Sequence, residues 1–167
     1  MASGTRIYVL MGVSGAGKTF IGKKLSEKSG WPFFEGDDFH PKANVEKMRQ
    51  GQPLNDEDRV PWLLELRKQI ETQLENGTTS IIACSALKAA YREVLQRDDR
   101  RVRFILLHGA QELLAKRLAE REHAYMPSSL LPSQLETLEI PEDVLTLDVA
   151  EEADSLIEQV LAYAEAD

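Results

Sequence analysis

The segment Gly12–Thr19 constrains this chain more than any other part of its sequence. It reads Gly-Val-Ser-Gly-Ala-Gly-Lys-Thr and matches the pattern G-x-x-x-x-G-K-[ST] in full. A hydrophobic run, Ile7–Met11, precedes it, and an amphipathic helical pattern, Lys18–Ser29, follows it. This order is typical of a P-loop, in which glycines let successive backbone N–H groups point at phosphate oxygens. The alternative, a chance glycine turn, would leave both flanks unexplained.

Each part of this loop has an expected role. The start of the following helix adds its positive dipole end. Lys18 is expected to reach the β- and γ-phosphates as a catalytic residue, and the Thr19 hydroxyl to ligate Mg²⁺. The expected ATP-binding residues are Gly12, Val13, Ser14, Gly15, Ala16, Gly17, Lys18 and Thr19.

Apolar runs alternate with helical patterns along the rest of the chain. The expected strands are Ile7–Met11, Pro32–Glu35, Ser80–Cys84, Val102–Leu107 and Val144–Val149. The expected helices are Lys18–Ser29, Val45–Gln50, Glu57–Glu75, Lys88–Arg97, Ala110–Arg121, Glu151–Ala164 and a short one near Ser133–Leu138. Such alternation predicts an α/β fold with a parallel sheet. We expect one domain over residues 1–167, with a lid at about 117–138.

Composition narrows the setting and the partners. The single cysteine, Cys84, excludes an internal disulfide and favours a reducing cytoplasm. No apolar run approaches the roughly 18–20 residues of a membrane span, so no membrane partner is expected. The net charge is −8, and residues 122–167 hold 12 acidic residues and no Lys or Arg. An acidic chain is a poor general nucleic-acid binder, whereas its mildly basic N-terminal part, with 16 acidic and 20 basic residues over 1–121, suits small anions.

Missing motifs exclude several classes of P-loop protein. No Asn-Lys-x-Asp run is present to read guanine, and the third expected strand does not end in a carboxylate. A hydrolytic ATPase would usually place a Walker B carboxylate near that end. The chain is also too short for motor or helicase machinery. Small kinases that phosphorylate metabolites fit these features.

Asp37 lies just past the second expected strand. Ligands of parallel sheets bind outside the carboxyl ends of the strands, so Asp37 is expected to face the γ-phosphate. Its carboxylate could accept the proton of an attacking hydroxyl, orient that hydroxyl or hold a metal-bound water. The alternative is an N-cap for the segment after Pro41. For Asp38, capping or solvent exposure is expected.

Three charged residues begin the helix expected at Glu57–Glu75. Asp56 and Asp58 favour the dipole there, so helix capping is expected of both. Arg59 opposes the dipole, and a role in clamping a carboxylate would explain it. The alternative is an ion pair of Arg59 with Asp56 or a neighbour.

Together these motifs resemble one family, the gluconate kinases (gluconokinases), over almost the whole chain. The resemblance rests on Met11–Thr19, Gly36-Asp37 with His40-Pro41, Asn44 with Glu46–Met48, Gly51–Arg59 with Pro61–Leu63, Cys84–Lys88 with Tyr91-Arg92, and Ser133-Gln134 with Glu136–Leu138. The blocks Gly51–Leu63 and Cys84–Arg92 are the specific ones, because shikimate and adenylate kinases share the P-loop without them.

The resemblance implies a fold, a reaction and an assembly. The fold is nucleoside-monophosphate-kinase-like, a three-layer sandwich with a five-stranded parallel sheet in order 2-3-1-4-5 and a lid. The reaction moves the γ-phosphoryl group of ATP, with Mg²⁺, to the 6-hydroxyl of D-gluconate. The products are ADP and 6-phospho-D-gluconate, which feeds the pentose phosphate or Entner–Doudoroff routes. The assembly is a homodimer.

A small anion with many hydroxyls needs cations and hydrogen-bond partners. Lys88 lies just past the third expected strand, and Arg92 follows one helical turn later on the same face. The alternative for Lys88 is an exposed lysine at a helix start. The expected substrate-binding residues are Asp37, His40, Arg59, Ser85, Lys88 and Arg92, with Asn44 as a further uncharged partner.

The expected lid carries further candidates. Arg117 and Arg121 lie four apart and could close over the phosphates as catalytic residues; the alternative is a solvated face that pairs with Glu120 or Glu122. The family usually reads Arg-x-Gly-His here, whereas this chain reads Arg121-Glu-His123-Ala124, so no role is assigned to His123. Two other functions stay open: a kinase for another polyhydroxy acid, and a nucleotide-binding regulatory module.

Overall fold

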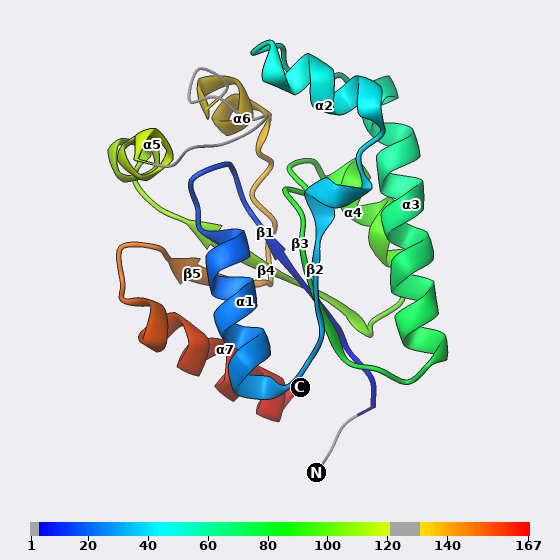
Figure 1. Cartoon of the computed structure of the whole chain (residues 1–167). Coiled ribbons are helices and arrows are strands. Elements are labelled where there is room, and N and C mark those ends of the chain that lie inside the picture. Colours follow the sequence, from blue (N-terminus) through cyan, green and yellow to red (C-terminus); the bar gives the residue numbers. More distant parts are fainter. Residues whose placement is uncertain (1–3, 121–130) are drawn as a thin grey trace.

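The fold is a five-stranded parallel sheet covered by helices on both faces (Figure 1). The computed structural model describes residues 4–120 and 131–167. Neighbouring strands pair in parallel in the order β2-β3-β1-β4-β5, which confirms the predicted order. The strands are β1 (Ile7–Met11), β2 (Phe33–Glu35), β3 (Ser80–Ala83), β4 (Val102–His108) and β5 (Leu145–Asp148).

The expected helices occur close to their predicted residues. They are α1 (Lys18–Ser29), α2 (Lys42–Arg49), α3 (Asp56–Glu75), α4 (Ala89–Gln96), α5 (Gln111–Ala119), α6 (Leu131–Thr137) and α7 (Ala153–Ala166). A short 3₁₀ helix, η1 (Gly36–Phe39), follows β2 and was not predicted. Among the described residues, no helix combines the length and apolar character needed to cross a membrane.

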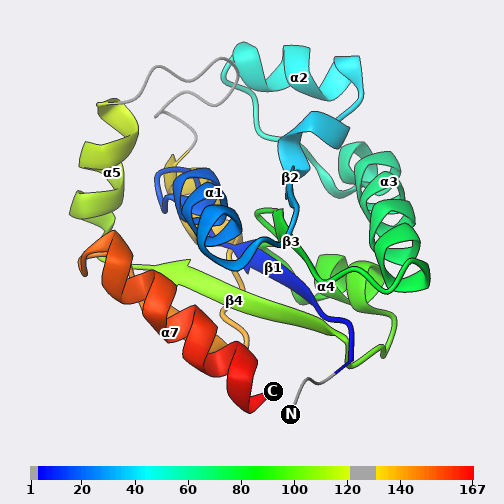
Figure 2. The same ribbon diagram turned by 60° about the horizontal axis from the view of Figure 1, so that its bottom comes forward.

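The side chains of β1 alternate between two hydrophobic cores. Ile7, Val9 and Met11 belong to the core that α3 and α4 cover, whereas Tyr8 and Leu10 belong to the one that α1 and α7 cover. All five are buried, as expected for a central strand with helices on both faces. Figure 2 shows α1 and α7 on one side of the sheet and α3 and α4 on the other.

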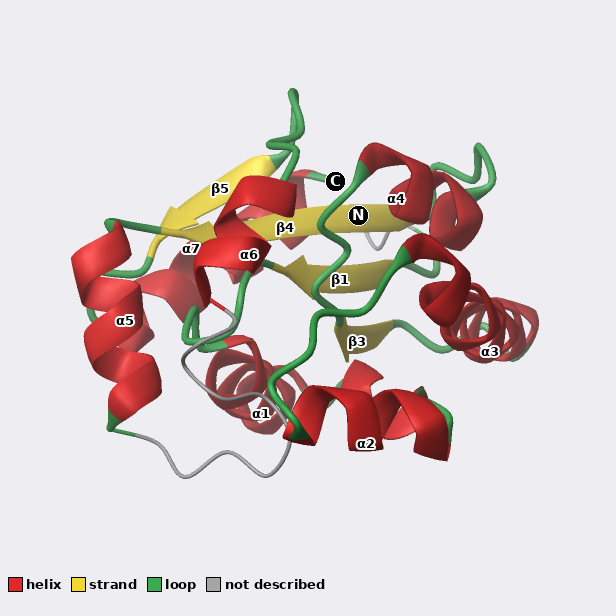
Figure 3. Cartoon of the chain, turned by 90° about the horizontal axis from the view of Figure 1, so that it is seen from above, coloured by secondary structure: helices red, strands yellow, loops and turns green. Residues whose placement is uncertain are grey.

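The P-loop and three helices gather at one end of the sheet. Figures 1 and 3 show α2, α5 and α6 at this end, which is the end where the parallel strands finish. Gly36 lets the chain pass closely there, because a Cβ on it would lie 2.2 Å from the carbonyl oxygen of Ala83. The residues that flank Gly36, Glu35 and Asp37, are thereby held at the end of β3.

Candidate active site

The P-loop has the backbone conformation that its glycines predicted. Gly15 and Gly17 have φ angles of 89° and 93°, in the left-handed region that favours glycine. Lys18 donates from Nζ to the carbonyl oxygens of Gly12 and Val13, at 2.9 and 3.1 Å. The loop therefore arches around the lysine that is expected to meet the phosphates.

Two cavities flank the P-loop and share no lining residue. The small cavity, of about 50 Å³, is lined by Ser14, Lys18, Asp37, His40, Met48, Pro53, Leu54, Arg59, Trp62, Ser85, Leu87, Ser133, Gln134 and Thr137. The large cavity, of about 670 Å³, is lined by Gly15, Ala16, Gly17, Thr19, Phe20, Ile21, Lys23, Arg117, Glu120, Val149, Glu151, Ala153 and Leu156. One loop thus contributes to two sites, as a protein that binds two ligands requires.

Asp37 faces the small cavity from η1. The Nε2 atom of His40 lies 3.9 Å from its carboxylate oxygen, and the His40 ring stacks on Trp62 with ring centroids 4.2 Å apart. Trp62 in turn donates its indole N–H to the carbonyl oxygen of Gly36, at 2.8 Å. Helix α2 begins at Lys42 with no side-chain cap, so the alternative role of Asp37 as an N-cap is wrong.

The hydrogen bonds of Asn44 fix the tautomer of His40. The Asn44 amide nitrogen donates to the carbonyl oxygen of Asp58, at 2.7 Å, and lies 3.2 Å from Nδ1 of His40. Because Nδ1 accepts there, a neutral ring carries its proton on Nε2, toward Asp37. Burial, reinforced by the charge of Arg59, lowers the pKa of His40 to about 4. His40 is therefore a neutral hydrogen-bond donor at neutral pH rather than a cation.

Arg59 reaches the small cavity from the first turn of α3. Its Nη1 donates to the Tyr91 hydroxyl at 2.9 Å, and its guanidinium carbon lies 5.2 Å from the centre of the Tyr91 ring. The Tyr91 hydroxyl donates to Asp56, and Lys88 donates to the same Asp56 oxygen at 2.9 Å. The alternative ion pair between Arg59 and Asp56 does not form, because Tyr91 lies between them.

The start of α3 corrects one expectation and confirms another. Asn55 is the N-cap, and its side chain accepts from the Asp58 backbone N–H at 2.8 Å while the Asp58 carboxylate accepts from the Asn55 backbone N–H at 2.9 Å. Asp58 therefore caps the helix as expected. The capping role predicted for Asp56 is wrong, since its carboxylate binds side chains of α4.

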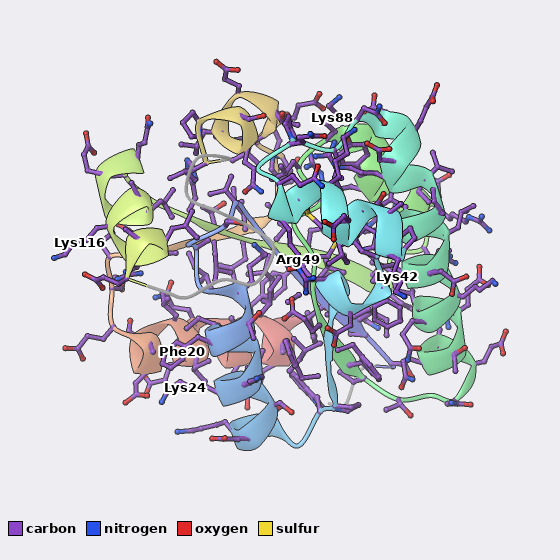
Figure 4. The ribbon with its side chains drawn as sticks, turned by 45° about the horizontal axis from the view of Figure 1, so that its top comes forward. Phe20, Lys24, Lys42, Arg49, Lys88 and Lys116 are labelled. Atoms are coloured by element: carbon purple, nitrogen blue, oxygen red, sulfur yellow. The ribbon has the colours of Figure 1, made fainter. Side chains whose placement is uncertain are left out.

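Two of the expected substrate-binding residues lie away from the small cavity. Lys88 lies at the start of α4 (Figure 4), where it pairs with Asp56, and it does not line the cavity. Arg92 is 8% exposed and donates to the carbonyl oxygens of Ala86 and Glu139, at 2.8 and 2.9 Å. Both side chains brace the loops around the site. The structure does bring Lys18, Asp37, His40, Arg59 and Ser85 together.

A carboxylate that the sequence analysis missed lies beside the expected magnesium ligand. The Thr19 hydroxyl donates to the carboxylate of Glu35 at the end of β2. Burial raises the pKa of Glu35, while the bond from Thr19 and the charge of Lys18 lower it. A Walker B carboxylate was expected only at the end of the third strand, whereas Glu35 lies at the end of the second. The spacing Glu35-x-Asp37, with two carboxylates at the end of one strand, was the sequence feature that could have indicated it.

Gln134 and Phe20 were also missed. Gln134 of α6 accepts from the backbone N–H of Ser14 at 2.7 Å, so α6 contacts the P-loop directly. Phe20 of α1, a residue that is 61% exposed, lines the large cavity (Figure 4). Arg117 of α5 lines the same cavity, whereas Arg121 and His123 lie outside the described residues.

Comparisons with known proteins agree with this arrangement. A family model described as an AAA domain matches residues 7–141. The chain is 44% identical to the gluconokinase of Gluconobacter oxydans, over 97% of this chain and 93% of that protein. It is 40% identical to the thermosensitive gluconokinase of Escherichia coli, over 91% and 83% of the two chains.

Solved structures give the same result. A gluconokinase from Sinorhizobium meliloti superimposes with a TM-score of 0.83 at 40% identity, covering 97% of this chain and 92% of that one. A sugar kinase from Janibacter reaches a TM-score of 0.89 at 42% identity, covering 96% and 95%. With this P-loop, this sheet order and these relatives, the chain belongs to the gluconokinase family of P-loop kinases.

Proposed function

We propose that this protein is a gluconokinase, which transfers the γ-phosphoryl group of ATP to the 6-hydroxyl of D-gluconate. The products are ADP and 6-phospho-D-gluconate. The observation that carries the proposal is that a carboxylate and a cation, Asp37 and Arg59, share the small cavity with Lys18 and Ser14 of the P-loop. The acceptor would bind in the small cavity and the nucleoside part of ATP in the large one.

The groups of the small cavity match the needs of the reaction. As the 6-hydroxyl oxygen forms its bond to phosphorus, the bond from phosphorus to the oxygen bridging the β- and γ-phosphates breaks, and ADP leaves. Asp37 would accept the proton that the hydroxyl loses, or orient that hydroxyl. Arg59 would bind the carboxylate of gluconate, and the Nε2–H of His40 would donate to a hydroxyl. Lys18 would neutralise charge on the phosphates.

Magnesium is part of the proposal. The Thr19 hydroxyl and the Glu35 carboxylate are in contact beside the P-loop, and hard oxygen donors of this kind suit Mg²⁺. Among the described residues, no group of three or more His, Cys, Asp or Glu side chains could hold a metal. A site that relies on the phosphates for further ligands agrees with that observation. When bound, the ion would neutralise charge on the phosphates.

A substrate panel tests the proposed function. The purified protein would be supplied with Mg-ATP and, in turn, with D-gluconate, related sugar acids, neutral sugars and shikimate, and ADP release would be followed with a coupled assay. We expect turnover with gluconate above all others. Turnover with another acid and none with gluconate would reject the assignment, and ATP binding without any transfer would favour a regulatory module.

We infer a single kinase domain with a lid at about 117–138, a homodimer and a cytoplasmic location, all of which rest on the sequence and on the family. Light scattering during size exclusion would test the dimer, which predicts twice the 18.8 kDa of one chain. A protein that elutes as a monomer at working concentration would contradict it.

A further inference from the structure

The cation that faces the small cavity is held by a side chain of another helix. Arg59 lies on α3, and the residue that accepts its hydrogen bond, Tyr91, lies on α4. The hydrogen bonds have one possible direction, because arginine can only donate and an ionised carboxylate can only accept. The Tyr91 hydroxyl therefore accepts from Arg59 and donates to Asp56.

In this arrangement no neighbouring carboxylate among the described residues pairs with the charge of Arg59. Asp56 precedes Arg59 by three residues on the same helix face, where a direct ion pair would be expected. Instead Tyr91 and Lys88 both bind the Asp56 carboxylate. Within residues 4–120 and 131–167, no carboxylate lies within 4.0 Å of the Arg59 guanidinium. The Arg59 guanidinium can therefore still form an ion pair with an anion that enters the cavity.

Burial makes the support rigid. Tyr91 is only 4% exposed, so its ring is fixed in the core that α3 and α4 share. The guanidinium lies over this ring as well as on the hydroxyl, and such stacking restrains a flexible arginine. Burial and the bond to Asp56 also raise the pKa of Tyr91, so the hydroxyl stays protonated and can donate.

We propose that Tyr91 is a positioning residue for substrate recognition: it holds Arg59 where the guanidinium reads the carboxylate of gluconate. Asp56 and Lys88 orient Tyr91 in turn. The proposal rests on the proposed function, because it takes gluconate as the occupant of the small cavity. It also gives Lys88 a role in the site without contact with the substrate.

The substitution Tyr91→Phe tests the proposal, because it removes the hydroxyl and keeps the ring. We expect the KM for gluconate to rise by about tenfold, the effect of one lost hydrogen bond to a charged group. The kcat and the KM for ATP should stay close to those of the unmodified protein. Tyr163→Phe is the matched control, since Tyr163 lies on α7 against Tyr8 in the other core. It should leave all three constants unchanged.

A double-mutant cycle separates positioning from a merely structural effect. If Tyr91 acts through Arg59, Tyr91→Phe should add nothing to the KM of an Arg59→Ala variant. The preference of the enzyme for gluconate over the neutral D-gluconamide should also shrink in Tyr91→Phe. An additional effect in the Arg59→Ala background, or an unchanged KM in the single variant, would overturn the proposal.

The design distinguishes this proposal from the proposed function. If the unmodified protein does not phosphorylate gluconate, the proposed function fails. If it does and Tyr91→Phe has a normal KM, only the positioning role fails. Should Tyr91→Phe not fold, Asp56→Ala removes the acceptor of the Tyr91 hydroxyl at an exposed side chain and breaks the same hydrogen-bond chain. It should raise the KM for gluconate in the same direction, and an unchanged value would again reject the role.

Discussion

The two cavities beside the P-loop are built on opposite principles. The small one is the more enclosed of the two, at about 50 Å³ against about 670 Å³. Its polar groups are held by hydrogen bonds to side chains behind the cavity wall, such as His40 to Asn44 and Arg59 to Tyr91. The large one is open and bordered by an exposed ring, Phe20. Fixed polar groups suit discrimination among hydroxy acids, whereas an open cavity suits a ligand that the P-loop already holds by its phosphates.

The substitution that should damage both cavities is Lys18→Ala. Lys18 lines the small cavity and begins α1, which forms a wall of the large one. We expect turnover to fall below detection in the coupled ADP assay, because the charge that meets the β- and γ-phosphates is lost. Lys24→Ala, a lysine of α1 that lines neither cavity, is the control. Substantial turnover in Lys18→Ala would exclude the phosphate role.

Asp37→Asn should affect the chemical step on the acceptor side alone. The amide cannot accept the proton of the attacking hydroxyl, so kcat should fall by roughly 10²- to 10⁴-fold. The KM for ATP should change little. Asp38→Asn, at the exposed neighbouring position, should behave like the unmodified protein. A near-normal kcat in Asp37→Asn would remove Asp37 from proton transfer.

Arg59→Ala should change substrate affinity on the acceptor side. A lost charge-assisted bond to a carboxylate predicts a rise in the KM for gluconate of about 10- to 100-fold. Steady-state kinetics with each substrate varied in turn would measure it, with the exposed Arg49→Ala as a control of equal charge. Equal rises for ATP and gluconate would show that Arg59 does not belong to the small cavity alone.

Arg117→Ala should change the kinetics with ATP and leave the KM for gluconate unchanged. Arg117 lines the large cavity beside the P-loop glycines, so kcat/KM for ATP should fall by about threefold to tenfold. The KM for gluconate should hold. Lys116→Ala removes the adjacent exposed cation of α5 (Figure 4) and controls for overall charge. A change in the KM for gluconate in Arg117→Ala would indicate that the cavities are coupled at this point.

His40 gives the smallest expected effect on turnover and a clear one on stability. Its pKa is about 4 in the folded protein, below its ordinary value, so the unfolded chain takes up the proton first as pH falls. The free energy of unfolding should therefore drop by about 3 kcal/mol between about pH 6.5 and pH 4. Urea denaturation at several pH values would measure this. A His40→Gln variant should have a flatter profile; an equally steep one would assign the effect to other groups.

Features set by neighbouring residues could be predicted from the sequence, and features set by distant partners could not. The P-loop and the apolar strands follow from local pattern, as does the capping role of Asp58. Lys88 looked like a substrate ligand because its position at the sheet edge is right. Its actual partner, Asp56, lies 32 residues away and was itself expected to cap a helix. Glu35 was missed because only folding brings it to Thr19.

The environment of Cys84 has a practical consequence. The sole thiol of the chain is fully buried at the end of β3, and burial raises its pKa to about 12. Reaction with alkylating reagents requires the thiolate, so Cys84 should remain unmodified in the folded protein. Any cysteine introduced on the surface would then be the only site to take a dye or spin label. The unmodified sequence can therefore serve as the background for labelled cysteine pairs that measure distances between α2 and α5 while substrates bind.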